Sequence, residues 1–484
     1  MKLTYDELEA QHIQTKSLLI KTEARLAETE ARLVEAHSQL FKMQELLKLA
    51  LDRVTKLEER LNKNSNNSSK PPSSDQKSNL PDKPKKDRKS RPGFNRKMLP
   101  KEAIDHFHVC KIDTCPCCGA KDLVDQNKPL ILQQVELPEV KAFFTQFECS
   151  KYACSSCGET SFAQLPKGVP DSAFGPRLMA LIGTLTGVFH LAKREAMQLV
   201  RDLYGVKISE GSIVNIEERV ADALEEIYLR IHKHVMTSVM PKHFDETSWR
   251  NNAKTHWVWV ASTSNATCFR LDPNRSKEAF KRFTGILGQA PVVTDRYGAY
   301  NDIGRPHQYC LAHLIRDFRK YAERDGPDGE IGKLLEADLR KICKTQRQFR
   351  EGNISARSRN ISFGHQKRRL SDHLIDGLAN GAAELSALCD RLWESMDKLW
   401  TFSNYTDVDP TNNLAERDLR KLVIWRKKSN GTRSNRGENF VEKISSVAGT
   451  VKKSHENVLN FVTDALNAFY SNQAAPFVSP IHSF

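Results

Sequence analysis

The chain has 484 residues, a formal net charge of +14 at pH 7 and 39% hydrophobic residues. This length exceeds what one hydrophobic core supports and predicts roughly three or four domains. The positive charge favours a polyanionic partner over a small acidic substrate. The polar N-terminus and the lack of a long apolar run predict neither an export signal nor a membrane partner.

Residues 1–63 predict a single long helix with a coiled-coil seam. No proline or glycine interrupts residues 5–63, and an apolar residue recurs every seven positions. Such a repeat predicts a homo-oligomer formed through this helix. An amphipathic helix packed on its own protein is the alternative, and Thr22 and Thr29 weaken the early part of the second seam row. The seam residues are Leu19, Leu26, Leu33, Leu40, Leu47, Val54 and Leu61.

Residues 64–101 are rich in Asn, Ser, Pro and Lys. A segment of this composition cannot bury enough apolar area to fold, so we predict a disordered basic linker. Its positive charge is also compatible with contacts to phosphate.

Residues 102–170 predict a zinc ribbon, because they contain the two C-x-x-C-G sequences CPCCG and CSSCG. This spacing lets two thiolates of each sequence bind one metal ion, and the glycine permits the tight turn. We therefore expect one structural zinc, with strand-like segments at 130–140 and 142–154 between the cysteine pairs. The predicted ligands are Cys115, Cys118, Cys154 and Cys157. The thiols that could substitute are Cys117, Cys110 and Cys149.

Residues 171–234 carry helical signals only. Gly205 is expected to end one helix and Ser209 to cap the next. Two short helices joined in this way could form a helix-turn-helix that binds DNA, although ordinary helical packing explains the same pattern.

Residues 235–310 and 406–450 predict an α/β catalytic core. Three strand-like segments, an amphipathic helix over 274–287 and a fourth strand at 291–295 follow one another. This order opens a ribonuclease-H-like fold, in which the first acidic ligand lies on the first strand and the second follows the fourth. Asp245 and Asp295 occupy those places. Glu246 could replace Asp245, although side chains alternate across a strand.

Residues 311–405 predict an all-helical insertion. At its start, Cys310 and His313 have C-x-x-H spacing, with Arg316 close by. A zinc site would need two more ligands that the nearby sequence lacks. We therefore expect these residues to support the core or to position DNA.

Glu416 lies in a helix-like, strongly basic segment, and residues 451–484 follow it as a helical tail. Basic side chains around a carboxylate suit a backbone phosphate. The two asparagines before Glu416 could contact phosphate or cap the helix. The predicted DNA-binding residues are Asn412, Asn413, Arg417, Arg420, Lys421, Arg426, Lys427 and Lys428.

Asp245, Asp295 and Glu416 together predict a metal centre. Three carboxylates that converge repel one another unless divalent cations neutralise them. Two ions, Mg²⁺ or Mn²⁺, about 4 Å apart are the usual arrangement for in-line displacement at phosphorus. The expected class is a metal-dependent polynucleotidyl transferase.

The segments DETSW, VVTDRYGAY, HQYCLAHLIRDFRKY and PTNNLAERDLRKLVIWRKKSNGTRS resemble the signature blocks of the insertion-sequence-sixty-six family of bacterial DDE transposases. The two C-x-x-C-G sequences are similar to its N-terminal half. Cys117 and Arg296 depart from the family pattern. The resemblance implies that Asp245, Asp295 and Glu416 form the DDE triad. It further implies a cytoplasmic, nucleoid-associated bacterial protein that cuts the ends of its own element and joins them to target DNA, with accessory proteins of the same element.

The predicted fold class is therefore multidomain α+β: a coiled-coil helix, a zinc ribbon, a helical region and a ribonuclease-H-like core with a helical insertion. Two alternatives stay open at this level. One is a metal-dependent nuclease that cuts without joining, and the other is a non-catalytic DNA-binding regulator with a zinc ribbon.

Overall fold

The computed structural model of the chain describes residues 5–64, 67, 97–126 and 128–479. The predicted basic linker lies almost entirely outside the described residues. The described chain is mixed α+β and mostly helical. No helix in these ranges is long and apolar enough to cross a membrane.

The chain divides into two compact units. Residues 1–81 and 307–411 form the unit that we call the helical unit, and residues 82–306 and 412–484 form the sheet unit.

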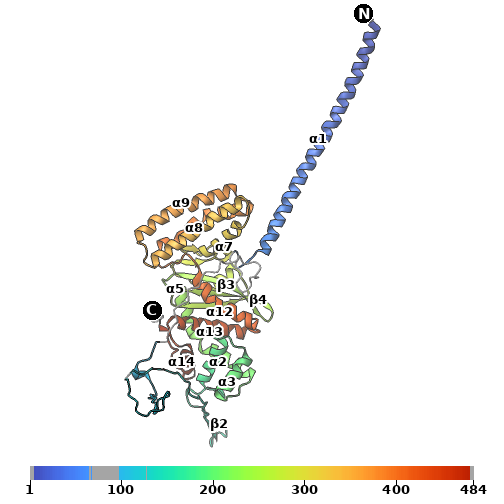
Figure 1. The fold of residues 1–484 in the computed structure, drawn as a ribbon. Helices are drawn as coiled ribbons and strands as arrows, with labels where there is room; N and C mark the ends of the chain where they lie inside the picture. The colour runs from blue at the N-terminus through green and yellow to red at the C-terminus, as the bar shows by residue number, and fades with distance from the viewer. Residues whose placement is uncertain (1–4, 65–66, 68–96, 127, 480–484) are drawn as a thin grey trace. The chain divides into compact units, whose positions relative to one another are not determined.

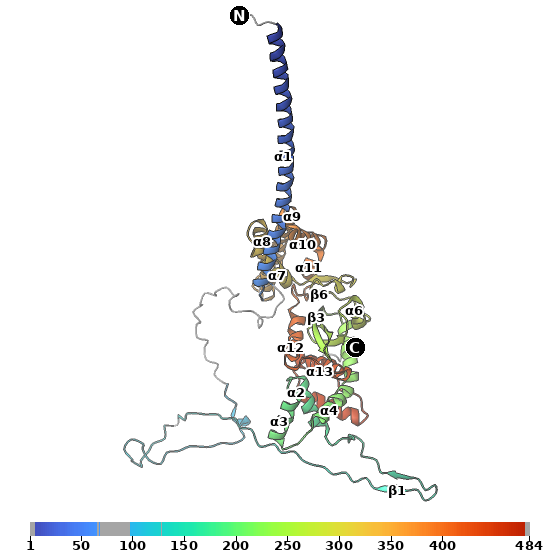
Figure 2. The same ribbon diagram turned by 90° about the vertical axis from the view of Figure 1, so that its right-hand side faces the viewer.

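The helical unit consists of helices and one short strand in its described residues, and helices fill most of residues 311–404, as their composition predicts (Figures 1 and 2). Its elements are α1 (Tyr5–Leu61), β7 (His307–Tyr309), α7 (Leu311–Ala322), α8 (Pro327–Arg350), α9 (Ala356–Asn380), α10 (Ala383–Glu394) and α11 (Met396–Asn404).

Helix α1 is continuous (Figure 2). Its apolar seam is exposed to solvent. The seven seam residues retain 50% to 72% of their accessible surface, so the described chain does not cover them. Near the end of α1, Glu59 accepts a hydrogen bond from Arg324 Nε at 2.7 Å and pairs with Lys320 at 2.8 Å. Polar contacts thus hold the end of α1 on the segment around α7, while the apolar seam is left open.

In the sheet unit, helices pack around a β-sheet (Figure 1). Its strands are β1 (Lys151–Ala153), β2 (Thr160–Phe162), β3 (Lys242–Asn251), β4 (Lys254–Ser262), β5 (Thr267–Asp272) and β6 (Val292–Thr294). Its helices are η3 (Lys101–Ala103), α2 (Pro176–Gly187), α3 (Lys193–Tyr204), α4 (Glu210–Ala223), α5 (Glu225–Thr237), α6 (Lys277–Thr284), η4 (Gly298–Tyr300), α12 (Asn413–Ser429), α13 (Asn435–Lys453) and α14 (Val458–Tyr470).

Within this unit, the main sheet has the strand order β5-β4-β3-β6. Strands β3, β4 and β5 are antiparallel, and β6 runs parallel to β3 after the crossover helix α6. The order of three strands, a helix and a fourth strand is the one that the sequence predicts. Buried aromatic side chains form the core on both faces of β3; they include Trp249, Trp259, Tyr300, Phe244 and Phe283.

Helix α13 covers the open edge of β5. An edge strand leaves every second backbone N–H unpaired, about 6.8 Å apart, and side chains four residues apart on a helix lie about 6 Å apart. The two spacings match, so polar side chains of α13 can pair with successive N–H groups. Glu442 Oε1, Ser446 Oγ and Thr450 Oγ1 accept hydrogen bonds from the N–H groups of Leu271, Phe269 and Thr267 at 2.5, 2.9 and 3.1 Å.

We expect Glu442→Gln to flatten the pH dependence of stability between about pH 4.5 and 7. Burial raises the pKa of Glu442 to about 7. In this window the folded state binds the proton more tightly than the unfolded state, so stability falls as pH rises. Gln keeps an acceptor for Leu271 N–H and removes the charge. The wild type should lose at most about 3 kcal/mol across the window, since one pKa unit corresponds to about 1.4 kcal/mol.

Urea denaturation at a series of pH values tests this expectation. Equal pH slopes for the wild type and Glu442→Gln would contradict it. The exposed Glu226→Gln on α5 removes the same charge and serves as the control.

Local signals place α3 and α4 correctly. Gly205, at φ 70°, ends α3 in the left-handed region that favours glycine. Ser209 caps α4 by accepting a hydrogen bond from Ser212 N–H at 3.1 Å. Both roles agree with the sequence-based expectation.

Helix α4, the predicted recognition helix, packs against the rest of the sheet unit. One face of the helix is buried in the core of the unit. The outward positions carry Glu210, Glu217 and Glu218, and the last two pair with Lys193 at 2.9 Å and Arg436 at 3.0 Å. These ion pairs link α4 to α3 and α13, and the helix-turn-helix stays a prediction.

The predicted strands between the cysteine pairs are largely absent. Residues 128–150 form no regular structure, and only the short hairpin β1–β2 is present near the second pair. Apolar side chains of this segment are exposed, including Leu130 at 98% and Phe143 at 90%. The prediction of strands at 130–140 is therefore wrong for this structure. A segment this small depends on its metal for folding free energy, and alternation alone does not pair strands.

Candidate active site

Side chains alternate across β3, and this alternation decides which acid faces α12. His243 Nδ1 lies 3.2 Å from Asn412 Oδ1, on the residue that precedes α12. Glu246, on the opposite face, accepts a hydrogen bond from Arg275 Nε at 2.9 Å. Asp245 shares its face with His243 because successive side chains point to opposite sides of a strand. It therefore faces α12.

The register between β3 and β6 brings Asp295 beside Asp245. His243 pairs with Val293 in the parallel ladder. Each aspartate follows its paired residue by two positions, so the two side chains lie next to each other at the same level of the sheet. The N–H of Tyr297 donates to Asp295 Oδ1 at 2.9 Å, which orients the carboxylate just beyond the strand end.

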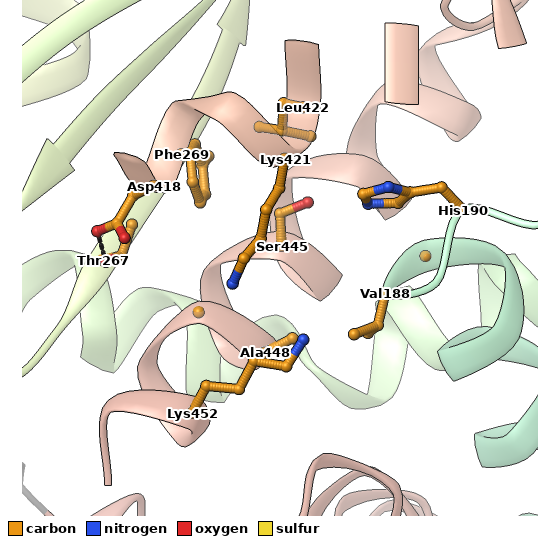
Figure 3. Close-up of a pocket in the computed structure, with 12 residues that line it drawn as sticks. Val188, His190, Thr267, Phe269, Asp418, Lys421, Leu422, Ser445, Ala448 and Lys452 are labelled. Carbon is orange, nitrogen blue, oxygen red and sulfur yellow. Dashed lines mark hydrogen bonds between the residues drawn. The ribbon is translucent and has the colours of Figure 1, made fainter. Parts of the chain in front are cut away.

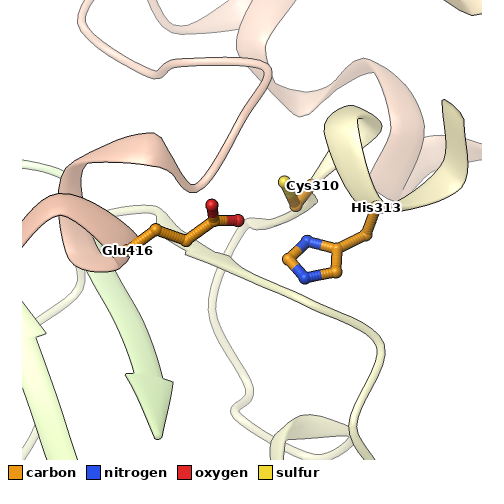
Figure 4. Close-up of side chains that lie close together, drawn as sticks. All are labelled: Cys310, His313 and Glu416. Atoms are coloured by element: carbon orange, nitrogen blue, oxygen red, sulfur yellow. The ribbon is translucent and has the colours of Figure 1, made fainter. Parts of the chain in front are cut away.

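Glu416 lies in the first turn of α12 (Figure 4), and Asn412 fixes the start of that helix on β3. The Asn412 side chain is fully buried. Its Nδ2 donates to the backbone oxygen of Phe244 at 2.7 Å, while its Oδ1 is held by His243. Because Phe244 directly precedes Asp245, this contact sets the position of the Glu416 helix relative to the first aspartate.

The three acids form one electrostatic group. The pKa of Asp245 lies well above its usual range, first because of burial and then because of the negative charges of Glu246, Asp295 and Glu416. Within the described chain, the carboxylate oxygens of Asp245, Asp295 and Glu416 do not all lie within 4.8 Å of one another. A group of negative charges that is half-buried and mutually repulsive is a donor set that suits divalent cations.

Glu246 is occupied by other partners. Besides Arg275, it accepts a short hydrogen bond from the Tyr300 hydroxyl. Burial and Asp295 raise its pKa, whereas Tyr300 and Arg275 lower it, and the net shift is upward. The Arg275 guanidinium is itself stacked on the Tyr297 ring at 3.8 Å. These contacts favour Asp245 over Glu246 as the metal-facing acid.

Two residues of this site could not be identified from the sequence. Arg275 precedes α6 and Tyr300 lies in η4, and neither belongs to a recognisable spacing pattern with Glu246. Tyr300 is fully buried, and its pKa is raised by burial, Glu246, Asp295 and Asp245. Its place within the block VVTDRYGAY is the one available signal, since a tyrosine five residues after Asp295 can turn back toward the strand.

The residues predicted to contact DNA, in and just before α12, fall into two groups: those bonded to β3 and those exposed to solvent. Asn412 is buried, and the Arg426 guanidinium is hydrogen-bonded to Thr247 and Ser248 of β3. Both residues hold α12 on the sheet; the fully buried Asn412 has no surface to offer to DNA, and a DNA contact of the partly exposed Arg426 stays a prediction. The residues whose side chains are exposed are Asn413, Arg417, Arg420, Lys421, Lys427 and Lys428.

The two cysteine pairs adopt the same turn. Gly119 and Gly158 have φ of 75° and 73°, and each donates its N–H to the backbone oxygen of Cys115 or Cys154, at 2.8 and 2.9 Å. Backbone hydrogen bonds from Cys118 and Cys117 lower the pKa of Cys115, and those from Cys157 and Ser156 lower the pKa of Cys154. Both turns therefore favour the thiolate that binds zinc.

The four cysteines are not gathered into one group. Among the described residues, no set of three of their sulfur atoms lies within 4.8 Å of one another. The geometry supports each half of the predicted zinc site, and the ligand assignment stays a prediction.

Cys310 and His313 lie at the start of α7 in the helical unit (Figure 4). Cys310 precedes the helix and is 1% exposed, and His313 N–H donates to its backbone oxygen at 3.2 Å. Arg316 follows on the same helix. Burial of Cys310 is consistent with the predicted support of the core.

The fold and the site define a mixed α+β protein with an acidic group at its sheet and two zinc-type cysteine turns. A profile described as "Transposase IS66 family" matches residues 171–439, which is more than half of the chain. The chain belongs to the IS66 family of transposases. The description "zinc-finger binding domain of transposase IS66" matches residues 113–158, and a family of unknown function matches residues 3–98.

A relative from Sinorhizobium fredii, named uncharacterized protein y4hP, is 23% identical over 397 residues. The alignment covers 73% of this chain and 70% of that protein.

Proposed function

We propose that this chain is a DNA transposase that binds the ends of its insertion sequence, cleaves them and joins the 3′-hydroxyl ends to target DNA. The observation that carries the proposal is that β3, β6 and α12 bring Asp245, Asp295 and Glu416 close enough for the charges of the other two to raise the pKa of Asp245. The order of the strands and α6 supports a ribonuclease-H-like core.

The proposed catalytic residues are the same three acids. Two divalent ions, Mg²⁺ or Mn²⁺, would neutralise the group and stabilise the charge that develops at phosphorus during displacement. A pair of ions suits carboxylates whose oxygens do not all lie within 4.8 Å. Tyr297 N–H orients Asp295, while Arg275 and Tyr300 each donate a hydrogen bond to Glu246 on the opposite face of β3.

The proposed reaction has two displacements. In the first, water adds across a phosphodiester at the end of the element, which leaves a 3′-hydroxyl and a 5′-phosphate. In the second, that 3′-hydroxyl forms a bond to a target phosphorus, and the target strand leaves with its own 3′-hydroxyl. The exposed Arg417 and Arg420, one and four residues after Glu416 on α12, would bind backbone phosphates near the acids.

Incubation of the full-length protein with labelled duplexes that carry the ends of its element, in Mg²⁺ or Mn²⁺, tests the proposal. Joined product is expected. Cleaved ends without joined product would identify the alternative nuclease, and binding without either product would identify the non-catalytic regulator.

We further propose that Cys115, Cys118, Cys154 and Cys157 bind one structural zinc. Purified protein should contain one zinc per chain by elemental analysis, and Cys118→Ser should lose it, because a three-cysteine site binds the ion more weakly. Cys117→Ser is the matched control and should retain zinc. The reverse result would assign Cys117 as the ligand in place of Cys118.

A further inference from the structure

The sheet unit has a pocket on a different side of α12 from Glu416. It is bounded by β5, α12, α13 and the chain after α2 (Figure 3). Asp418 and Lys421 line it, and on a helix of 3.6 residues per turn they are turned about 200° and 140° from Glu416. The pocket is therefore separate from the acidic group.

Two lysines direct their ammonium groups into this pocket. Lys421 enters from α12 and Lys452 from α13 (Figure 3). Neither forms an ion pair within the described part of the chain. Burial and the charge of Lys421 lower the pKa of Lys452, so the two cations repel each other. Two cations that share a pocket and lack an internal counterion are suited to an external anion.

The one carboxylate that lines the pocket is already neutralised. Asp418 accepts hydrogen bonds from Ser262 at 2.8 Å and Thr267 at 2.7 Å, and it pairs with Lys453 at 2.8 Å. Burial alone would raise the pKa of Asp418, but Lys453 and these hydrogen bonds keep it below its usual value. Lys453 and the two hydroxyl groups thus neutralise the negative charge of Asp418, and the net charge of the pocket remains positive.

His190 adds a neutral polar group. It has φ of 57°, a conformation uncommon for a residue with a side chain, and its ring stacks on Trp425 at 4.7 Å. The strained backbone holds the imidazole at the pocket (Figure 3). Burial, followed by the charges of Lys428, Lys452 and Lys421, lowers its pKa to about 4, so the ring is neutral at pH 7 and can donate one N–H.

We propose that this pocket binds one backbone phosphate of a DNA strand, at a point away from the acidic site. Lys421 and Lys452 supply the charge, the His190 ring borders the anion, and the apolar wall formed by Val188, Phe269 and Leu422 suits the adjoining deoxyribose. This inference rests on the proposed function in that the phosphate belongs to DNA. It adds Lys452 of α13 and His190, which follows α2, to the predicted DNA-binding residues, of which Lys421 is one.

The test is the affinity of Lys452→Gln for duplex DNA as a function of salt concentration. Loss of one phosphate contact should weaken binding roughly three- to tenfold at 0.15 M salt and should reduce the slope of log K against log salt by about 1. Lys233→Gln on α5, which is exposed and removes the same charge, is the matched control and should match the wild type. Lys452 is exposed, so equal thermal midpoints for all three proteins should show that folding is unaffected.

Three outcomes would overturn the inference, and they are distinguishable. If the wild type binds DNA and Lys452→Gln equals Lys233→Gln, the pocket does not hold a DNA phosphate. If inorganic phosphate raises the thermal midpoint of the wild type alone while the DNA affinities agree, the ligand is a free anion. If the wild type binds no DNA, the proposed function itself fails.

Discussion

Replacing Asp245 by Asn is expected to reduce end cleavage and joining by at least roughly 10³-fold, since a bound metal contributes several kcal/mol and each 1.36 kcal/mol is a factor of ten. Asn is nearly isosteric, but it removes the charge that metal binding requires. Binding of the element's ends should persist, because the basic side chains of α12 are unchanged. Labelled-end assays and a gel-shift titration measure the two quantities separately.

The same variant should not destabilise the metal-free protein. Burial and the neighbouring acids raise the pKa of Asp245, so folding disfavours its negative charge relative to the unfolded chain. Asn relieves that repulsion, and the thermal midpoint should stay level or rise. Asp222→Asn, on the exposed side of α4, is the matched control for both measurements. Cleavage within tenfold of the wild type, or a large drop in the midpoint, would refute the role assigned to Asp245.

Replacing Leu33 and Leu40 by Glu is expected to convert an oligomer into a monomer of 55.0 kDa. Both leucines lie on the exposed seam of α1, and two charges in a coiled-coil core cost several kcal/mol. Light scattering during size-exclusion chromatography gives the mass directly. Joining of two ends should fall in parallel, because it requires two acidic sites in one complex.

Ala31→Glu with Ser38→Glu is the matched control for the seam. These residues lie on α1 away from the seam and receive the same two charges, so the mass should remain that of the wild type. A wild type that is already a 55.0 kDa monomer would exclude the coiled coil.

Patterns that depend on near neighbours were predictable. Gly205 and Ser209 mark helix ends through their own backbone chemistry, and the strand, helix and strand order that carries Asp245 and Asp295 follows from local periodicity. The alternation of side chains along a strand also predicts that Asp245 and Glu246 lie on opposite faces of β3. The hydrogen bonds of the two faces agree with this: His243 contacts Asn412 on one face, and Glu246 contacts Arg275 on the other.

Contacts between distant segments were not predictable. Asn412 and Arg426 lie in a basic run that predicts a DNA surface, and nothing in that run indicates that their side chains bond to β3. Glu246 is bound by Arg275 and Tyr300, which lie in two segments distant from it in the sequence. In the cysteine-rich segment, composition predicts strands, but pairing also needs a metal and a neighbouring strand, which periodicity does not report.

The cover that α13 places over β5 has a consequence for synthesis on the ribosome. Strand β5 is translated more than 160 residues before the residues of α13 that pair with it. Until then the backbone N–H groups of β5 remain unpaired and can bind any other extended polypeptide. Products truncated before residue 435 keep that edge unpaired permanently, so premature termination yields an aggregation-prone fragment in place of a merely inactive one.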